Sequence, residues 1–416
     1  MDSFTFVKII KMRKLSYLFK IIVYMYMCTL SLQAHAQFTL KGKVTNKQTG
    51  ANLPSVSIYI NNSVKGTATN NVGEYELQNI NVAQFDIVAS CIGYETFSAT
   101  ITSKDLLQAY DIKLNPKSAE LQAVIVQTYD KSGWKNWGKI FTEEIIGKMP
   151  YASDCEIKNH EVVKFVYNKK EQTLVAFADE PLIIINKYLG YELRYDMQTF
   201  VTNFSTKIMN YEGYPFFVNL AGSDKKIKKW KANRKYAYEG SVLHFMRSIF
   251  RNTTTQEGFT IRVLKRYANA EKIRVRKVYK DLIVKENGSI TIKKTDSLDY
   301  YQKILQQSDS MDFVSAIPIN ADSIAYAENK TTAGISFNNH LQITHNSIKQ
   351  VPYKKTFEIT YEKEHPVSII CIRNDTDIFV FANGTYINPS SLLNEGYWAY
   401  SERLCNLLPI DYEVGE

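Results

Sequence analysis

The chain between Phe38 and about Val126 consists of short stretches in which hydrophobic and polar side chains alternate. Four of them, FTLKGKV, SVSIYI, EYELQNI and FDIVAS, carry β-branched or aromatic residues at every second position, as strands with one buried face do. Turn formers such as Gly50, Pro54 and Asn71 lie between them. About seven such runs in this region predict an all-β sandwich.

Beyond about position 150 the pattern mixes strands with helices and is rich in aromatic side chains. Segment 191–198 alternates Tyr, Leu, Tyr and Met with polar residues, and Asn-Gly pairs at 287–288 and 383–384 lie between strand-like runs, which predicts hairpins. Hydrophobic residues three and four apart predict helices at 241–251 and 397–408. The expected fold class is mainly β with α (α+β): a sandwich, then a larger aromatic-rich α+β domain.

The N-terminal 36 residues have the pattern of an export signal. Five basic residues precede an apolar run at 21–32, and Ala34-His35-Ala36 places small residues where a signal peptidase cleaves. The run is short for a bilayer span, so a membrane anchor or a buried helix is the lesser alternative. The signal is complete from either Met1 or Met12. We therefore expect an exported protein of the periplasm, or of the periplasmic or outer face of the outer membrane, with no transmembrane span after cleavage.

Export changes what the charge of the chain means. The formal charge is +9 and the aromatic fraction is 13%, a combination that suggests nucleic acid or an anionic surface as partner. Removing residues 1–36 deletes five basic residues and one acid, which leaves +5. Export excludes nucleic acid as a natural partner, whereas an envelope protein, a glycan or an anionic lipid surface stays open.

Short motifs along residues 38–115 resemble one known family. Gly42-Lys-Val44, Leu53-Pro54, Gly73-Glu-Tyr75 and Ile92-Gly93-Tyr94 are similar, in order and spacing, to the carboxypeptidase regulatory-like domain. The resemblance implies a transthyretin-like β-sandwich of the kind that precedes other domains in exported Bacteroidota proteins. Asn46 and Asn70 stand where the family often has Asp, at turn positions that tolerate either residue.

The family name does not bring peptidase chemistry with it. In the carboxypeptidases the sandwich is an accessory domain, and the zinc site of the catalytic domain needs a His-x-x-Glu pair. In this chain no histidine is followed by glutamate three residues later, so the zinc motif of a metallocarboxypeptidase is absent. The larger region, with GYPFF and GSVLHFMRSIF among its segments, resembles the uncharacterised downstream part of Bacteroidota proteins that carry the sandwich, which implies no activity.

These patterns divide the chain into four parts. We expect a signal peptide at 1–36, a carboxypeptidase regulatory-like β-sandwich at 37–116, a connecting strand and helix at 117–150, and an uncharacterised α+β domain at 151–416.

One segment of the connection is close to a nucleotide-binding motif. Gly133 through Ile140 reads G-W-K-N-W-G-K-I and follows a strand-like run at 123–127. A P-loop needs Ser or Thr at the last position to ligate Mg²⁺, and isoleucine cannot do so. The better interpretation is a short helix whose apolar stripe contains Trp137, Ile140, Phe141 and Ile145.

The remaining chemistry-bearing residues give no catalytic signature. Cys91, Cys155, Cys371 and Cys405 would allow three complete disulfide pairings, and buried free thiols are an open alternative. No C-x-x-C occurs. His340 and His345 are five apart in a predicted strand and are therefore expected to point to opposite faces. We expect no catalytic residues, no metal and no cofactor.

A run of cations at 225–235, KKIKKWKANRK, is the strongest candidate for a binding site. Together with the next predicted helix it could hold phosphate or carboxylate groups. The alternative is a solvated helix face with Ile227 and Trp230 packed inward. The helix template places His244, Arg247 and Arg251 on the polar face. The anion-binding candidates are Lys228, Lys229, Arg234, His244, Arg247 and Arg251.

Two functions follow from these observations. The first is an exported, non-catalytic cell-envelope protein that serves as a binding or structural module for a protein, a glycan or an anionic envelope component. The alternative is a cell-wall or polysaccharide-processing enzyme with a site in the larger domain. Two close carboxylates in a deep pocket would favour the enzyme, and a basic or aromatic surface would favour binding.

Overall fold

The computed structural model describes residues 38–80, 84–102, 105–117, 129–286, 289–292, 295–348, 360–373 and 376–415. The expected signal peptide, the strand at 123–127 and the turn at 287–288 lie outside these residues. The chain divides into two compact units. The first unit contains the described residues up to Ile58 together with Lys65–Cys91 and Thr96–Asn115, and the second contains Tyr59–Val64, Ile92–Glu95 and the described residues from Pro116 onwards.

The first unit is a β-sandwich, as its alternating pattern predicts. Its two sheets have the strand orders β4-β1-β7 and β3-β2-β5-β6. β1 pairs antiparallel with β4 and parallel with β7. Side chains such as Leu40, Ile58 and Leu77 are fully buried between the sheets. The strands are β1 (Phe38–Asn46), β2 (Ser57–Ile60), β3 (Gly66–Ala68), β4 (Glu74–Ile80), β5 (Gln84–Ser90), β6 (Phe97–Thr102) and β7 (Ile112–Leu114).

The backbone geometry of the turns in the sandwich explains the asparagine and glycine residues found there. The side-chain oxygen of Asn46 accepts backbone N–H groups of Gln48 and Thr49, and that of Asn70 accepts those two and four residues later. Asparagine therefore accepts the same backbone hydrogen bonds that aspartate would accept at these positions. Gly73 has φ +80°, and a Cβ there would lie 2.8 Å from the carbonyl oxygen of Val44, so the turn requires glycine.

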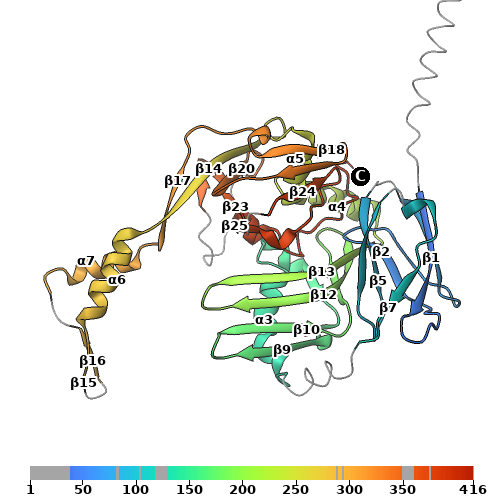
Figure 1. Ribbon diagram of the computed structural model, residues 1–416, viewed down its shortest axis with the longest axis horizontal. Coiled ribbons are helices and arrows are strands. Elements are labelled where there is room, and N and C mark those ends of the chain that lie inside the picture. The colour runs from blue at the N-terminus through green and yellow to red at the C-terminus, as the bar shows by residue number, and fades with distance from the viewer. Residues whose placement is uncertain are drawn as a thin grey trace, which may run out of the picture. The chain divides into compact units, whose positions relative to one another are not determined.

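The first helix of the second unit in the described residues is α3 (Gly133–Ile145), which packs on a six-stranded antiparallel sheet (Figure 1). The sheet has the order β8-β11-β12-β10-β9, with β13 also paired to β12. β12 alternates as predicted, because Tyr191, Leu193, Tyr195 and Met197 are buried. Its strands are β8 (Cys155–Ile157), β9 (Val163–Asn168), β10 (Thr173–Ala178), β11 (Leu182–Asn186), β12 (Tyr191–Asn203) and β13 (Ile208–Asn219).

The near-P-loop segment is helical from its first residue, because α3 starts at Gly133. Its amides therefore cannot form a loop around phosphate. Phe141 and Ile145 are fully buried, and Trp137 and Ile140 pack against the same core. The apolar stripe predicted for this helix is confirmed.

Further sheets complete the second unit. A five-stranded sheet has the order β17-β14-β20-β23-β25 and a three-stranded sheet the order β18-β19-β24. α4 (Asp224–Tyr238), α5 (Val242–Arg251) and α8 (Tyr397–Ser401) belong to this part. The strands are β14 (Phe259–Ala268), β17 (Ser310–Val314), β18 (Ala325–Asn329), β19 (Thr332–Ile335), β20 (His340–His345), β21 (Tyr361–Glu362), β22 (His365–Pro366), β23 (Ser368–Ile372), β24 (Ile378–Phe381) and β25 (Leu392–Gly396).

Between β14 and β17 the chain leaves these sheets and forms two helices with a hairpin between them (Figure 1). α6 packs on α7 and on β15. The elements are α6 (Ala270–Leu282), β15 (Ile283–Glu286), β16 (Ser289–Ile292) and α7 (Leu298–Gln306). Short 3₁₀ turns elsewhere in the chain cover Asp105–Leu107, Pro150–Asp154, His160–Val162, Ala321–Ser323 and Pro389–Ser391.

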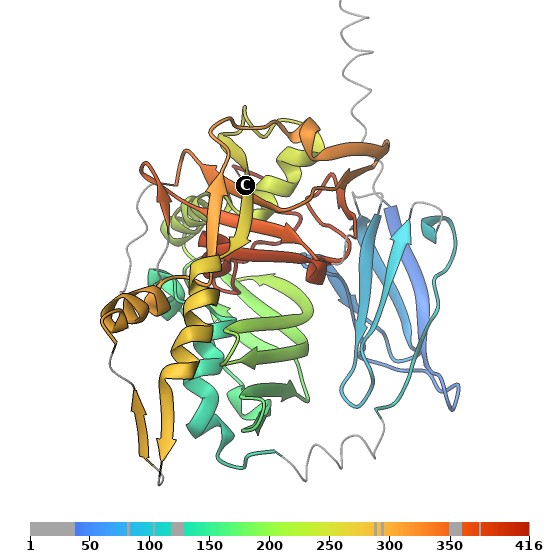
Figure 2. The same ribbon diagram turned by 60° about the vertical axis from the view of Figure 1, so that its left-hand side comes forward.

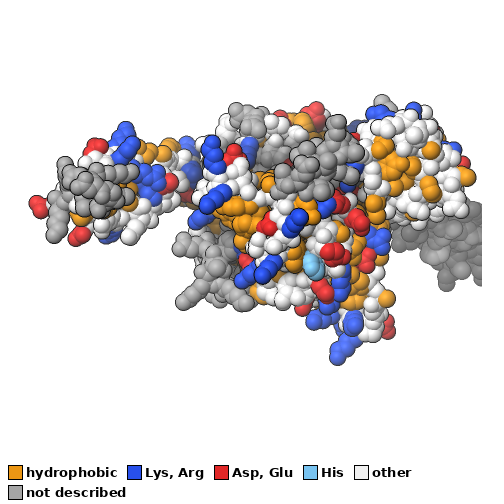
Figure 3. All heavy atoms as spheres, turned by 90° about the horizontal axis from the view of Figure 1, so that it is seen from below, with side chains coloured by type: hydrophobic (Ala, Val, Ile, Leu, Met, Phe, Trp, Pro, Cys, Tyr) orange, Lys and Arg blue, Asp and Glu red, His pale blue; other side chains and the backbone are white. Residues whose placement is uncertain are grey.

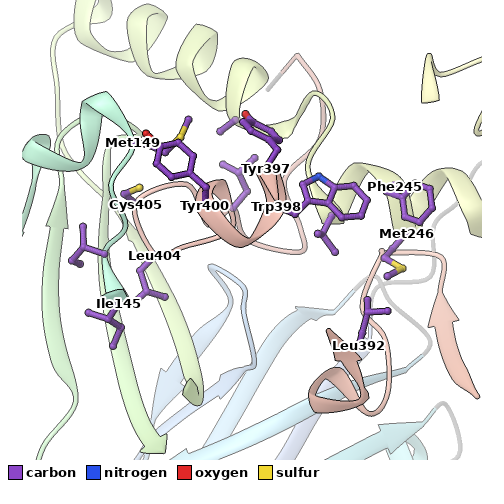
Figure 4. Packing of buried hydrophobic residues seen from close by; sticks show 14 of the residues in the cluster. Ile145, Met149, Phe245, Met246, Leu392, Tyr397, Trp398, Tyr400, Leu404 and Cys405 are labelled. Carbon is purple, nitrogen blue, oxygen red and sulfur yellow. The ribbon is translucent and has the colours of Figure 1, made fainter. Parts of the chain in front are cut away.

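The helix predicted at 397–408 ends early, at Ser401. The reason is a tertiary contact, since the N–H groups of Leu404 and Cys405 donate to the carbonyl oxygens of Ile145 and Ile146 at 3.1 and 3.0 Å. These carbonyls belong to the last turn of α3, where a helix leaves its acceptors unpaired. Figure 4 shows Leu404 beside Ile145 and Cys405 near Met149. The predicted apolar side chains are buried, but in an irregular segment.

The four cysteines of the described chain carry free thiols. Cys405 is fully buried, and burial raises its pKa. None of the helices in the described ranges is both long enough and apolar enough to cross a bilayer.

Candidate functional site

α4 carries the cation run, and three of its side chains fix it to the loop between β11 and β12. The indole N–H of Trp230 donates to the Lys187 carbonyl at 3.0 Å, and the amide of Asn233 donates to the Tyr188 carbonyl at 2.7 Å. Arg234 completes the set. Positions 230, 233 and 234 lie on one side of a helix, so the other sides of α4 are left free of this anchor.

All six lysines of α4 are exposed, and five of them form what we call the α4 lysine surface. None of these five takes part in an ion pair with another described residue, whereas Lys235 pairs with Glu239 at 3.8 Å. Trp230 is buried as expected, but Ile227 is 39% exposed, so the expectation that it packs inward is wrong. Ile227 lies in the first turn of the helix, ahead of the anchoring contacts. The α4 lysine surface consists of Lys225, Lys226, Lys228, Lys229 and Lys231.

Arg234 is engaged inside the protein. Its guanidinium donates to the carbonyls of Leu189 and Gly190 at 2.8 and 3.2 Å and to the side-chain oxygen of Asn219 at 3.1 Å. It also lies 3.8 Å from the ring centroid of Tyr191, a cation–π contact. The N–H groups of Arg234 therefore donate to other parts of the protein, and these hydrogen bonds hold α4 in position.

His244 lies on α5, which starts where the sequence predicts. The Ser241 hydroxyl accepts the His244 N–H at 3.1 Å and caps the helix. The sequence places His244 and Arg247 on a polar, exposed face of the helix. This prediction is wrong, because both residues are buried. The reason is that segments far along the chain cover α5, and helix periodicity does not report them.

The partners of His244 fix its protonation. Nδ1 accepts the Gly240 N–H at 3.1 Å, so the proton is on Nε2, which donates to the Glu257 carboxylate at 3.0 Å. Burial lowers the pKa of His244 to about 4, and nearby His345 adds to this. At neutral pH this imidazole is uncharged and does not attract anions.

Arg247 donates to three backbone carbonyls. They belong to Asn383, Ile410 and Tyr412, at 2.9, 2.8 and 2.9 Å. The side chain is 3% exposed. Arg247 thus joins the turn after β24 and the segment 410–412 to α5.

Arg251 forms an ion pair at the end of α5. Its guanidinium donates to both carboxylate oxygens of Glu257 at 2.7 and 3.2 Å. The same carboxylate also accepts from Thr253 and His244. A bidentate pair of this kind satisfies the arginine within the protein.

The six candidates therefore do not form one site. Lys228 and Lys229 are exposed on α4, while Arg234, His244, Arg247 and Arg251 hydrogen-bond to other parts of the protein. Successive residues of a helix are rotated by 100°, so Lys225 and Lys228 point away from the side that carries Trp230. Arg234 lies on the same side as Trp230. This periodicity could have shown from the sequence that Arg234 faces the protein while Lys225 and Lys228 face the solvent.

The histidines of β20 are on opposite faces of their strand, as predicted, and His345 is buried. Its Nε2 donates to the Glu257 carbonyl at 2.9 Å, and its Nδ1 faces the Ser347 hydroxyl at 2.8 Å. In the part of the chain that the structure describes, no three His, Cys, Asp or Glu side chains form a group that could hold a metal ion.

Comparison with known proteins identifies the first unit. Residues 40–126 match the family model described as the CarboxypepD_reg-like domain. The chain thus carries a carboxypeptidase regulatory-like domain, as its motifs indicate. A search of curated proteins found none that matches the chain.

Proposed function

We propose that this chain is an exported, non-catalytic module of the cell envelope that binds an acidic glycan through the α4 lysine surface. The observation that carries the proposal is that the five lysines of the α4 lysine surface are exposed on a helix that Trp230, Asn233 and Arg234 fix to the loop between β11 and β12. The carboxypeptidase regulatory-like domain supports it, because such sandwiches are accessory modules in the carboxypeptidases. The N-terminal signal pattern supports export.

The chemistry of the surface suits a repeating anion. Lys225, Lys228 and Lys229 are three and four residues apart and lie on one side of the helix, which rises about 6 Å from the first to the last of them, so these ammonium groups can contact several acidic groups along one chain. Lysine is a strongly hydrated point charge on a flexible stem, which favours contact with mobile carboxylates over recognition of one rigid shape. Binding of this kind weakens with salt.

The test is charge reversal on α4. The variant Lys225→Glu, Lys228→Glu, Lys229→Glu should bind polygalacturonate at least about tenfold more weakly than the unchanged chain, because roughly 1.4 kcal/mol or more of attraction is lost. It should also lose most of the salt dependence between low and high NaCl. Isothermal titration calorimetry at two salt concentrations measures both quantities.

The control reverses three exposed lysines elsewhere, as Lys277→Glu, Lys280→Glu, Lys303→Glu, and should bind within about twofold of the unchanged chain. Equal weakening by both triple variants would mean that net charge alone attracts the glycan, which would overturn the assignment to α4. Undiminished binding by the α4 variant would overturn it as well.

A further inference from the structure

The described residues between 265 and 317 (265–286, 289–292 and 295–317), which we call the arm, extend away from the five-stranded sheet (Figures 1 and 2). β14 pairs with β20 up to Leu264, and from Lys265 to Ala268 it is paired with β17. The ribbon leads to α6, the β15–β16 hairpin and α7. In the arm, therefore, the chain lies outside the large core of the second unit.

One face of the ribbon is apolar and uncovered. Tyr267 lies opposite Met311, and Phe313 lies opposite Lys265, so these four side chains share a face because residues two apart in a strand do so. Tyr267, Met311 and Phe313 are 52%, 47% and 57% exposed. The rings of Tyr267 and Phe313 are in contact, with centroids 5.6 Å apart. We call these three side chains and Lys265 the ribbon face.

Exposed apolar side chains are concentrated in the arm. Of the 17 large hydrophobic residues that are exposed in the described chain, nine lie between Tyr267 and Ile317. Scattered exposed hydrophobic residues are normal, but a contiguous group marks an interaction site. A two-stranded ribbon is also only marginally stable in water, so a surface that covers this face would stabilise it.

Ion pairs stabilise the ribbon away from the ribbon face. Arg266 donates to Asp312 at 2.7 and 2.9 Å and to Glu395 of β25 at 2.8 Å. Asp309 pairs with Lys272 and Arg276 of α6, each at 2.7 Å. These ion pairs hold the ribbon and α6 in place, so the ribbon face is presented by a supported structure.

The arm is also basic. Between Lys265 and Val314 the sequence has eleven Lys and Arg against seven Asp and Glu, a net charge of +4. Three of the acids, Glu271, Asp309 and Asp312, are engaged in ion pairs within the arm. Lys277 and Lys280 of α6 are exposed. Figure 3 shows basic and acidic side chains with hydrophobic ones between them on the surface of the arm, at the left of that view.

The exposed apolar side chains and the positive charge of the arm allow a choice between two binding partners, a second copy of the chain and an anionic bilayer. A symmetric contact with a second copy would place one arm of charge +4 against another, which is repulsive. An anionic bilayer surface attracts the lysines through its headgroups and accepts aromatic side chains at its interface. We propose that the arm docks on an anionic lipid surface, with Tyr267, Met311 and Phe313 inserted among the headgroups and Lys265 beside them. This site is separate from the α4 lysine surface.

The experiment is cosedimentation of the signal-free chain with lipid vesicles. The unchanged chain should bind vesicles of phosphatidylethanolamine and phosphatidylglycerol, and raising NaCl to high concentration should weaken binding at least about fivefold. Vesicles of phosphatidylcholine alone should bind at least about tenfold more weakly. Equal binding to both kinds of vesicle would overturn the proposal.

Two variants and one control locate the contact. Tyr267→Ser, Met311→Ser, Phe313→Ser should weaken binding to the anionic vesicles at least about tenfold, because apolar area no longer enters the interface. Lys265→Glu, Lys277→Glu, Lys280→Glu should do the same and abolish the salt effect. The control Ile208→Ser, Ile227→Ser, Tyr236→Ser changes apolar residues outside the arm that are 46%, 39% and 47% exposed and should bind within about twofold of the unchanged chain.

Melting curves check that each variant is folded, which is expected because the substituted side chains are about half exposed. Vesicle binding that survives both arm variants would overturn the proposal. So would light scattering that shows a dimer of the unchanged chain, dissociated by the serine variant, together with no vesicle binding. Loss of vesicle binding with intact glycan binding would separate this site from the proposed function of α4.

Discussion

His244 shows how burial changes what a residue can do. In the sequence it stands among cations on a predicted polar face, and in the protein it is a neutral hydrogen-bonding group held between Gly240 and Glu257. The Ser241 cap next to it was predictable, because capping depends on residues within one turn. The environment of His244 was not, because it includes His345, a residue 101 positions later in the chain.

The pKa of His244 predicts how stability depends on pH. Its folded value of about 4 lies below the ordinary 6.5, so between these values the unfolded chain takes up the proton and the folded one does not. The free energy of unfolding should therefore fall as pH decreases from about 6.5 towards 4, by up to about 3 kcal/mol from this group. Urea unfolding at pH 7.0 and pH 4.5 measures the loss.

The comparison that isolates His244 is His244→Gln, which removes the titrating ring. The difference in unfolding free energy between the two pH values should be smaller in this variant than in the unchanged chain. Burial raises the pKa of Glu402 to about 7, and this group acts with the opposite sign, but it is present in both proteins and cancels in the comparison. The same pH dependence in both proteins would contradict the assignment.

At the scale of elements, the start of a helix was easier to predict than its end. α5 begins after Ser241 and α3 has the expected apolar stripe, because both depend on local spacing. α8 ends at Ser401 because the next residues hydrogen-bond to the last turn of α3, about 260 positions earlier in the sequence. Periodicity contains no information about such a partner. The ribbon face was missed for the same reason, since its two pairs, Tyr267 with Met311 and Lys265 with Phe313, join residues 44 and 48 positions apart.

The position of α4 depends on a glycine. Gly190 has φ +76°, and a Cβ there would lie 2.2 Å from the Trp230 ring. Gly190→Ala should therefore displace Trp230 and loosen α4, with a loss of about 2–4 kcal/mol from strain and lost packing. Trypsin should cleave the lysine-rich helix faster, and mass spectrometry of the fragments measures this.

The control for Gly190→Ala is Gly50→Ala. Gly50 has a similar φ of +71°, but a Cβ there would have no neighbour within 4 Å. This variant should lose only about 1 kcal/mol, the cost of the left-handed conformation, and cleavage within α4 should stay at the rate of the unchanged chain. Equal cleavage rates for the two variants would show that the contact with Trp230 does not hold the helix.

At the scale of the whole molecule, the charge is distributed unevenly. α4 contains seven basic residues and one acid, a net +6, and the arm contributes +4. Without residues 1–36 the chain has +5, so its remaining residues together carry −5. The small net charge of the chain is therefore the sum of two basic segments, α4 and the arm, and a net negative charge on the remaining residues. The sandwich was predictable because its motifs are local and match a known domain, while the function of the larger unit depends on where these segments lie.

Export predicts a defined mature end. If signal peptidase cleaves after Ala36, the chain recovered from the envelope fraction should begin at Gln37, because Ala34 and Ala36 provide the small side chains that the enzyme requires. N-terminal sequencing measures this. The variant Ala34→Arg, Ala36→Arg should keep its signal. Recovery of the uncleaved chain from the cytoplasm would contradict export.

The contacts of residues 404–412 also determine when the larger unit can fold during synthesis. Leu404 and Cys405 pair with the end of α3, and Arg247 holds the carbonyls of Ile410 and Tyr412. The ribosome adds about 5–20 residues per second, so α3 waits on the order of ten seconds or more for its partners. During this interval the last turn of α3 and the side chain of Arg247 lack the partners that they have in the folded unit.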